Sequence, residues 1–152
     1  MYSVWVIPPE DVTERLKKPM ARLRSEFGGP EFEPHGVKAY TATVEKVATG
    51  TFFYECIFLL LHPTPQVVEA SSHCTGHFGY KSSTPYMPHL SILYGDLSNE
   101  EKKKAQAKAN ILDENISSLR FQISSLALYK ADTEDMTLKS WKKIAEFNLD
   151  TN

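Results

Sequence analysis

Two short segments of the chain, each an aromatic residue, a spacer and then Pro-His, constrain its fold more than any other feature. The first segment, FEPH, ends at His35, and the second, YMPH, ends at His89. A chain of 152 residues has room for one domain or for two small lobes. The repeated motif therefore predicts two related halves, each of which supplies one histidine.

The two halves differ in length after the histidine. In the second half, the rest of a strand and a helix follow His89, and a segment of alternating character begins 30 residues later, at Leu119. In the first half, a similar segment begins at Val37, two residues after His35. The first half is therefore shorter by 28 residues, and we expect it to lack one helix and part of a strand. The apolar surface left uncovered is expected near three residues: Val44, Phe53 and Phe58.

Strand and helix patterns follow one another along the chain without a linker or a low-complexity segment. Ser98 followed by Glu101 is a capping box, which predicts that a helix begins there. Pro19 lies inside a helical pattern and predicts either a kink or a later helix start. Strands are predicted at 2–8, 38–50, 51–62, 88–95, 117–132 and 140–149, and helices at 11–27, 64–78 and 98–112. This order indicates one α+β domain over residues 1–152, with mostly antiparallel pairing.

Composition and charge argue against several classes of protein. Hydrophobic residues make up 41% of the chain, which is enough for a packed core, so disorder is not expected. Lys and Arg number 17 against 19 Asp and Glu, whereas proteins that wrap duplex nucleic acid usually carry a basic excess. The longest apolar run, CIFLLL, is too short to span a bilayer, and the first residues lack the basic start of a signal peptide. We expect a cytoplasmic protein with no membrane segment and no stable nucleic-acid complex.

Two histidines that face one phosphate can hydrolyse its ester without a metal, because one takes a proton from water and the other protonates the leaving oxygen. Imidazole suits both roles since its unperturbed pKa, about 6.5, lies near neutral pH. In a strand, His89 and Ser91 point to the same face, so the Ser91 hydroxyl can donate to a phosphate oxygen beside the imidazole. Taken alone, H-x-S is common by chance, and a strand-end histidine with an ordinary hydrogen bond also explains it.

Longer segments make the interpretation more specific. The chain resembles the plant cyclic phosphodiesterases of the two-histidine phosphoesterase superfamily. The resemblance extends over nearly the whole chain and is carried by YSVW at 2–5, RLRSEFGGPEFEPH at 22–35, KAYTATVEKVATGTFF at 38–53, TPYMPHLSILYG at 84–95 and LALYKADTEDMTLKSW at 126–141. It implies a two-lobed, pseudo-twofold α+β fold, in which antiparallel sheets face a central cleft and helices lie outside.

The resemblance also implies an activity. Members of this family hydrolyse ADP-ribose 1'',2''-cyclic phosphate, a by-product of tRNA splicing, to ADP-ribose 1''-phosphate. They open nucleoside 2',3'-cyclic phosphates to 2'-phosphates as secondary substrates. Each lobe supplies one H-x-[TS] motif, and the reaction needs no metal. We therefore expect a metal-independent cyclic phosphodiesterase whose ligand is a small cyclic nucleotide.

The family's functional residues can be placed on this chain one by one. His89 and Ser91 match the second H-x-[TS] motif, and His35 matches the histidine of the first. Tyr94 matches an aromatic residue that lines the cleft, and Trp5 matches a tryptophan close to it. The first hydroxyl has no counterpart, because Val37 occupies its position. This departure supports an alternative, an inactive truncated relative that binds a nucleotide or a protein partner.

Two other groups of residues have simpler explanations than a site. His73, Cys74 and His77 are close in sequence, with the two histidines one helical turn apart, but no further nearby Cys or His completes a tetrahedral zinc site, so a helix surface is favoured. Tyr86 and Phe53 could stack on a purine, although core packing is the commoner role of such residues. We expect no cofactor and no metal, and a monomer.

Overall fold

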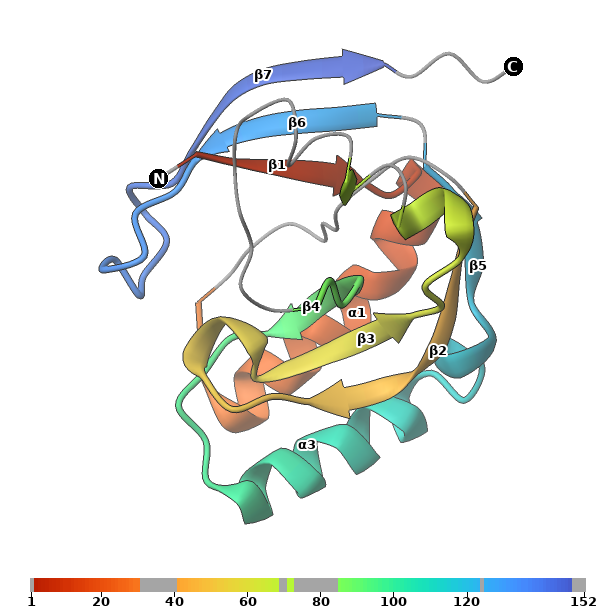
Figure 1. Ribbon diagram of the computed structural model, residues 1–152. Coiled ribbons are helices and arrows are strands. Elements are labelled where there is room, and N and C mark those ends of the chain that lie inside the picture. The colour runs from red at the N-terminus through yellow and green to blue at the C-terminus, as the bar shows by residue number, and fades with distance from the viewer. Residues whose placement is uncertain (1, 31–40, 69–70, 73–84, 124, 149–152) are drawn as a thin grey trace.

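The computed structural model describes residues 2–30, 41–68, 71–72, 85–123 and 125–148, with the backbone alone described at 2–6, 126, 147 and 148 (Figure 1). These residues form helices together with two antiparallel sheets, one of four strands and one of three. This mixture confirms the α+β class. None of the described helices combines the length and the apolar character needed to cross a membrane.

The larger sheet has the strand order β4-β3-β2-β5, and every neighbouring pair is antiparallel. Its strands are β2 (Thr41–Thr49), β3 (Ile57–Leu61), β4 (His89–Leu93) and β5 (Arg120–Gln122). Two helices, α1 (Glu10–Phe27) and α3 (Asn99–Leu112), pack against it: α1 contacts β4, α3 contacts β2 and β3, and the helices contact each other. The main hydrophobic core lies between these helices and this sheet.

Helix α1 forms because apolar residues recur at helical spacing, with Val12, Leu16, Met20 and Leu23 all buried. The helix runs without interruption through Pro19, which is itself buried. The later start that the proline suggested is therefore wrong. The helix ends at Gly28, whose backbone amide donates to the carbonyl of Arg24.

The other helix starts follow their local signals. Both bonds of the capping box before α3 are present: Ser98 N donates to the Glu101 carboxylate at 2.8 Å, and Glu101 N donates to Ser98 Oγ at 3.3 Å. The helix expected from Thr64 begins there, since residues 65–68 and 71–72 are helical and Val67 N donates to Thr64 Oγ1 at 3.4 Å. Short 3-10 turns, η1 (Phe53–Glu55) and η2 (Ile116–Ser118), precede β3 and β5.

The smaller sheet has the order β1-β6-β7 and is drawn at the top of Figure 1. Its strands are β1 (Tyr2–Ile7), β6 (Ser125–Lys130) and β7 (Lys142–Asn148). The single strand predicted at 117–132 is in fact divided: β5 pairs with β2 in the larger sheet, whereas β6 pairs with β1 and β7 in the smaller one. This stretch therefore links the two sheets.

Two expectations about the first half need correction. Val44 and Phe58 are only 1% and 3% exposed, so the apolar surface expected to be uncovered there is buried. Val44 is buried in the core beneath α1 and α3, whereas Phe58 is on the other face of β3, where its ring meets that of His89. The strand predicted at 51–62 is shorter than expected, because η1 occupies its first part and β3 begins at Ile57.

Candidate active site

His89 is the first residue of β4, and its ring is partly exposed. The ring lies edge-on to Phe58 in the neighbouring strand, with the ring centroids 5.2 Å apart. Nδ1 is 2.9 Å from the carbonyl oxygen of Met87. Because a carbonyl can only accept, the Nδ1 nitrogen carries the hydrogen of this bond, and in the neutral ring Nε2 is then the basic nitrogen. Within the described part of the chain, Nε2 has no hydrogen-bond partner.

Ser91 follows two residues later on the same strand. It lies opposite Phe58 in the ladder, whereas Leu90 and Ile92 are part of the main core, so His89 and Ser91 face away from α1. The serine is 3% exposed, and its Oγ donates to the carbonyl oxygen of Tyr54 at 3.3 Å. This hydroxyl is therefore held inside the site, by a long hydrogen bond.

Tyr94 comes directly after β4 and is buried. Burial raises the pKa of its phenol well above the ordinary value, and a hydrogen bond with the Ser91 side chain opposes part of that rise. Tyr94 therefore stays neutral near pH 7. Its ring meets that of Tyr54 edge-on, with the centroids 5.4 Å apart, and lies 6.3 Å from the ring of Phe53 and 6.4 Å from that of Trp141.

The loop between β6 and β7 closes over this aromatic group. Tyr54 donates through its hydroxyl to the carbonyl oxygen of Thr133 at 2.8 Å, and Trp141 Nε1 donates to that of Asp132 at 2.7 Å. Burial, followed by the nearby carboxylates of Asp135 and Asp132, raises the pKa of Tyr54. The Tyr54 bond joins the loop to η1, the Trp141 bond closes the loop on itself, and the rings of Tyr54 and Trp141 lie 5.6 Å apart.

Asp135 organises the tip of the same loop. Its carboxylate accepts hydrogen bonds from the backbone amides and the hydroxyls of Thr137 and Ser140. These donors, those of Ser140 first, hold the pKa of Asp135 far below its usual range. Leu138, between them, has a φ of 61° and is 8% exposed. A bulky residue rarely adopts this left-handed conformation, so the loop's own bonds must impose it.

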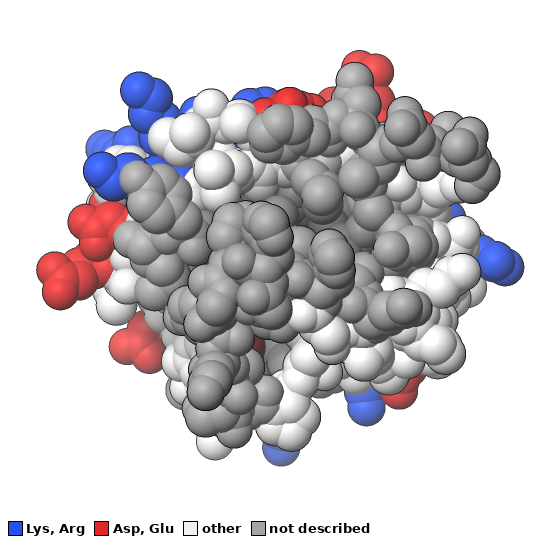
Figure 2. All heavy atoms as spheres, turned by 45° about the horizontal axis from the view of Figure 1, so that its top comes forward, with Lys and Arg blue, Asp and Glu red and all other residues white. Residues whose placement is uncertain are grey.

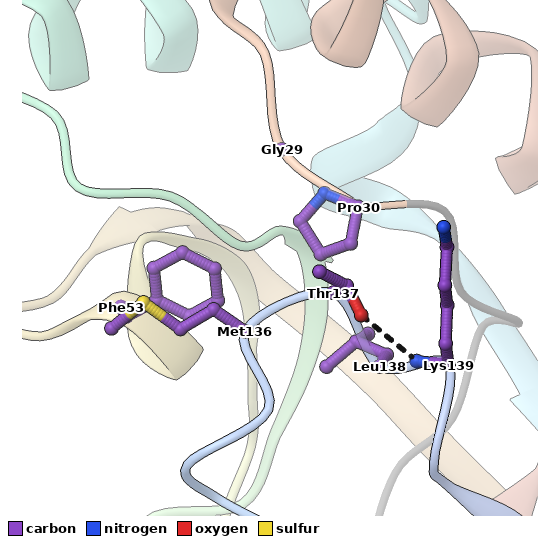
Figure 3. A pocket seen from close by; sticks show the side chains of 7 residues that line it. All are labelled: Gly29, Pro30, Phe53, Met136, Thr137, Leu138 and Lys139. Carbon is purple, nitrogen blue, oxygen red and sulfur yellow. Dashed lines mark hydrogen bonds between the residues drawn. The ribbon is translucent and has the colours of Figure 1, made fainter.

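A pocket of about 610 Å³ opens between this loop, η1 and the end of α1 (Figure 3). It is lined by Gly29, Pro30, Phe53, Met136, Thr137, Leu138 and Lys139. His89 is not among these residues. At about 3.3 Å per residue, the two ends of β4 are roughly 13 Å apart, and the pocket lies near the Tyr94 end. The aromatic group, with Tyr94 at its centre, thus separates the histidine from the pocket.

The structure describes only some of the predicted site residues. His35 and Val37 fall outside the described residues, as do His73, Cys74 and His77. The backbone of Trp5 lies opposite Ala127, while its side chain is not described. Among the described residues, no three potential metal-ligating side chains gather to hold an ion.

Sequence reasoning did not find several residues around the site, namely Tyr54, Trp141, Leu138 and Lys139. Residues 132–135 form a turn, in which Asp135 N donates to the Asp132 carbonyl at 3.2 Å. The density of hydroxyl and carboxylate side chains in DTEDMTLKS was a signal that this turn is built by its own hydrogen bonds.

Comparison with known proteins decides the family. The chain is 49% identical over 172 residues to a cyclic phosphodiesterase of Arabidopsis thaliana, a match that covers 98% of this chain and 95% of that protein. The chain belongs to the plant cyclic phosphodiesterases. A second plant cyclic phosphodiesterase, from Triticum aestivum, is 70% identical over 23 residues, which are 15% of this chain and 45% of that one. No protein-family model matches the chain.

The Arabidopsis cyclic phosphodiesterase also bears on the unequal halves. The comparison extends over 172 residues, but this chain has only 152, so at least 20 of the compared residues have no counterpart here. The present chain is thus shorter than its relative, just as its first half is shorter than its second half by 28 residues.

Proposed function

We propose that the chain hydrolyses cyclic phosphate esters by paired histidine acid–base catalysis, without a metal. The substrates are ADP-ribose 1'',2''-cyclic phosphate, opened to ADP-ribose 1''-phosphate, and nucleoside 2',3'-cyclic phosphates, opened to 2'-phosphates. One observation carries the proposal: in a chain half identical to a cyclic phosphodiesterase, His89 presents its Nε2 while Met87 fixes its Nδ1.

In this mechanism His89 Nε2 removes a proton from water as the water oxygen attacks phosphorus. For a nucleoside 2',3'-cyclic phosphate, the bond between phosphorus and the 3' oxygen then breaks, and that oxygen receives a proton from His35. The 2'-phosphate remains. The hydrogen bond from Nδ1 to the Met87 carbonyl stabilises the imidazolium that forms. After this step His89 is protonated and His35 is neutral. Exchange of protons with solvent returns both histidines to their starting states.

Ser91 contributes a hydrogen bond to a non-bridging phosphate oxygen. Its hydroxyl donates to the Tyr54 carbonyl at 3.3 Å, near the long limit for such a bond, so turning it towards a phosphate sacrifices little. A hydrogen bond to a charged group is worth about 1.5–3 kcal/mol. Replacing Ser91 by Ala should therefore slow turnover by roughly ten- to a hundredfold.

Surface charge is consistent with a small substrate rather than with duplex nucleic acid. On the face shown in Figure 2, both basic and acidic side chains lie around the edge of the described surface. The chain as a whole carries a net charge of -2. A localised phosphate site needs no basic excess, whereas binding along a duplex does.

Val37 supports one alternative, an inactive relative that binds a nucleotide or a protein partner. The position that matches the first hydroxyl holds a side chain that cannot donate a hydrogen bond. Losing that bond should weaken turnover but not abolish it, provided that His35 still reaches the phosphate. We therefore expect slow hydrolysis rather than none.

The test is turnover of uridine 2',3'-cyclic phosphate, with phosphorus NMR to distinguish the 2'-phosphate from the 3'-phosphate. His89→Ala should abolish activity, and Ser91→Ala should reduce it by one to two orders of magnitude. His62→Ala is the matched control, because His62 is an exposed histidine just after β3. An unchanged rate in His89→Ala would disprove the site, and no turnover by the wild type would favour the inactive relative.

A further inference from the structure

The pocket beside the aromatic group has two chemically different walls (Figure 3). On one side Met136 lies against the ring of Phe53, and on the other Lys139 extends its ammonium towards the segment of Gly29 and Pro30. Met136 is 55% exposed, although methionine is usually buried. A volume of about 610 Å³ is within the range of small-molecule sites.

The positive charge on this pocket is not neutralised within its own loop. The Lys139 side chain forms no ion pair with any residue that the structure describes. Asp135 has the carboxylate that is nearest to Lys139 along the chain within this loop. That carboxylate accepts hydrogen bonds from Thr137 and Ser140 instead. An ammonium group at the rim of an apolar pocket can pair with a ligand phosphate.

The pocket wall is fixed by the fold. Hydrogen bonds to Asp135 and from Trp141 to Asp132 hold the loop together, Tyr54 joins it to η1, and Leu138 is left-handed between Thr137 and Lys139. Backbone strain of this kind tends to concentrate where ligands bind. A surface turn with no further role would be more stable with glycine at this position.

One side chain, that of Tyr94, lies between the pocket and the proposed catalytic residues. The ring of Tyr94 is 6.3 Å from that of Phe53, and its hydroxyl is hydrogen-bonded to Ser91. A substrate whose cyclic phosphate lies at His89 and Ser91 would have to extend past Tyr94 to enter the pocket. A nucleoside cyclic monophosphate has no second phosphate for that position, whereas a dinucleotide-like substrate has both further phosphates and a base.

We propose that this pocket is a subsite for the nucleoside diphosphate portion of a cyclic phosphate substrate, with a phosphate paired to Lys139 and the base stacked against Phe53 and Met136. The inference rests on the proposed function. It makes Lys139 the residue that favours substrates carrying additional phosphates over simple nucleoside 2',3'-cyclic phosphates. The two substrate classes then share the catalytic histidines and differ in this pocket.

The experiment compares two substrates, ADP-ribose 1'',2''-cyclic phosphate and uridine 2',3'-cyclic phosphate, in the wild type and in Lys139→Gln. We expect KM for the ADP-ribose substrate to rise about three- to tenfold with kcat unchanged, since the pair is solvent-exposed. KM for the uridine substrate should not change. Lys139→Arg should retain most of the affinity. Lys103→Gln is the control, because it removes the same charge from an exposed position on α3.

Each other outcome has a defined meaning. An equal rise in KM for both substrates, or no change for either, overturns the subsite, and so does an effect of the same size in Lys103→Gln. If the wild type hydrolyses neither substrate, the proposed function fails, and ADP binding is measured by calorimetry instead. Binding that Lys139→Gln weakens at least threefold supports the pocket on its own, whereas no binding by the wild type rejects it.

Discussion

Two neighbouring glycines at the end of α1 allow a matched test of how the site is held together. Gly28 and Gly29 have φ values of 79° and 105°, which side chains rarely adopt. A Cβ at Gly28 would meet nothing within 4 Å. A Cβ at Gly29 would overlap the backbone oxygen of Tyr94 at well under 3.0 Å, a separation that real Cβ atoms essentially never show. The two alanine variants therefore share the strain and differ in the clash.

The magnitudes follow from that difference. Gly28 combines its φ of 79° with a ψ of -168°, a region that only glycine occupies readily, so Gly28→Ala should cost about 1–3 kcal/mol of unfolding free energy. Gly29→Ala carries a similar backbone penalty and an overpacking penalty of about 1–3 kcal/mol, since the obstructing atom is backbone and cannot rotate away. The unfolding free energy of Gly29→Ala should therefore be about 1–3 kcal/mol lower than that of Gly28→Ala.

Activity should separate the two variants further. Gly29 borders the pocket, and the carbonyl that it contacts belongs to Tyr94, whose side chain is hydrogen-bonded to Ser91. Relieving the overlap moves these groups apart by roughly 1 Å, and a displacement of that size in an active site can cost about a hundredfold in rate. Gly28→Ala has no such contact and should retain most of the activity.

Urea unfolding followed by tryptophan fluorescence gives the stabilities, and turnover of uridine 2',3'-cyclic phosphate in the absence of urea gives the rates. Circular dichroism confirms that both variants are folded before they are compared. If Gly29→Ala is as stable and as active as Gly28→Ala, the close approach of α1 to Tyr94 is not what positions the site.

Two further predictions concern charge and metal. Arg15 donates to both carboxylate oxygens of Asp113, at 2.7 and 2.9 Å, and this pair of hydrogen bonds lowers the pKa of Asp113. The stabilisation that the pair gives to the folded chain is therefore present above about pH 4 and is lost as pH falls through the lowered pKa. Because the arginine side chain is 39% exposed, Asp113→Asn should cost only about 0.5–1 kcal/mol at pH 7 and almost nothing at pH 2, measured by thermal unfolding at both pH values. Turnover should also survive excess EDTA; loss of activity that one divalent ion restores would contradict the paired-histidine mechanism.

The helices were predictable because their signals are local. The spacing of Val12, Leu16 and Leu23 fixed the buried face of α1, and Ser98 with Glu101 fixed the start of α3. The late start suggested by Pro19 was wrong, since packing of the apolar face offsets the loss of one hydrogen bond.

The division of residues 117–132 between two sheets was not predictable. The apolar residues alternate through Leu119, Phe121 and Ile123 and then shift by one position, after two serines, to Leu126 and Leu128. This shift marks an interruption, but it does not indicate which sheet each part joins. What distinguishes them is their partners, β2 for one and β1 with β7 for the other, and these lie far away in the sequence.

The candidate site shows the same contrast. His89 and Ser91 were identifiable because residues two apart in a strand share a face. Tyr54 and Trp141 were not, because they come from η1 and the end of the loop before β7 and meet only in the folded chain. The left-handed Leu138 could not be anticipated, since neither glycine nor asparagine marks its position.

The shorter first half can be reconciled with an intact core through the strand order. In the larger sheet β3 lies between β2 and β4, and β4 carries His89. The segment that begins at Leu119 matches the one that begins at Val37, so β6 corresponds to β2, and the next strand, β7, corresponds to β3. Among the described strands, however, β7 pairs with β6 alone. Among the described strands, the position beside β7 that would match β4 is therefore unfilled, and it is an edge of the smaller sheet, away from the core between α1, α3 and the larger sheet.

A vacancy at a sheet edge explains why Val44 and Phe58 stay buried, because neither belongs to the smaller sheet. A strand edge with no partner among the described residues can nevertheless be a template for association, and natural proteins protect such edges with charge, lysine above all. Strand β7 begins with the exposed lysines Lys142 and Lys143, and Lys142 lies directly opposite Lys130 in the ladder. Like charges in that arrangement weaken the β6–β7 pair slightly, but they also oppose the addition of another strand. The described part of β7 thus begins with two lysines, which precede Ile144, an apolar residue that is 49% exposed.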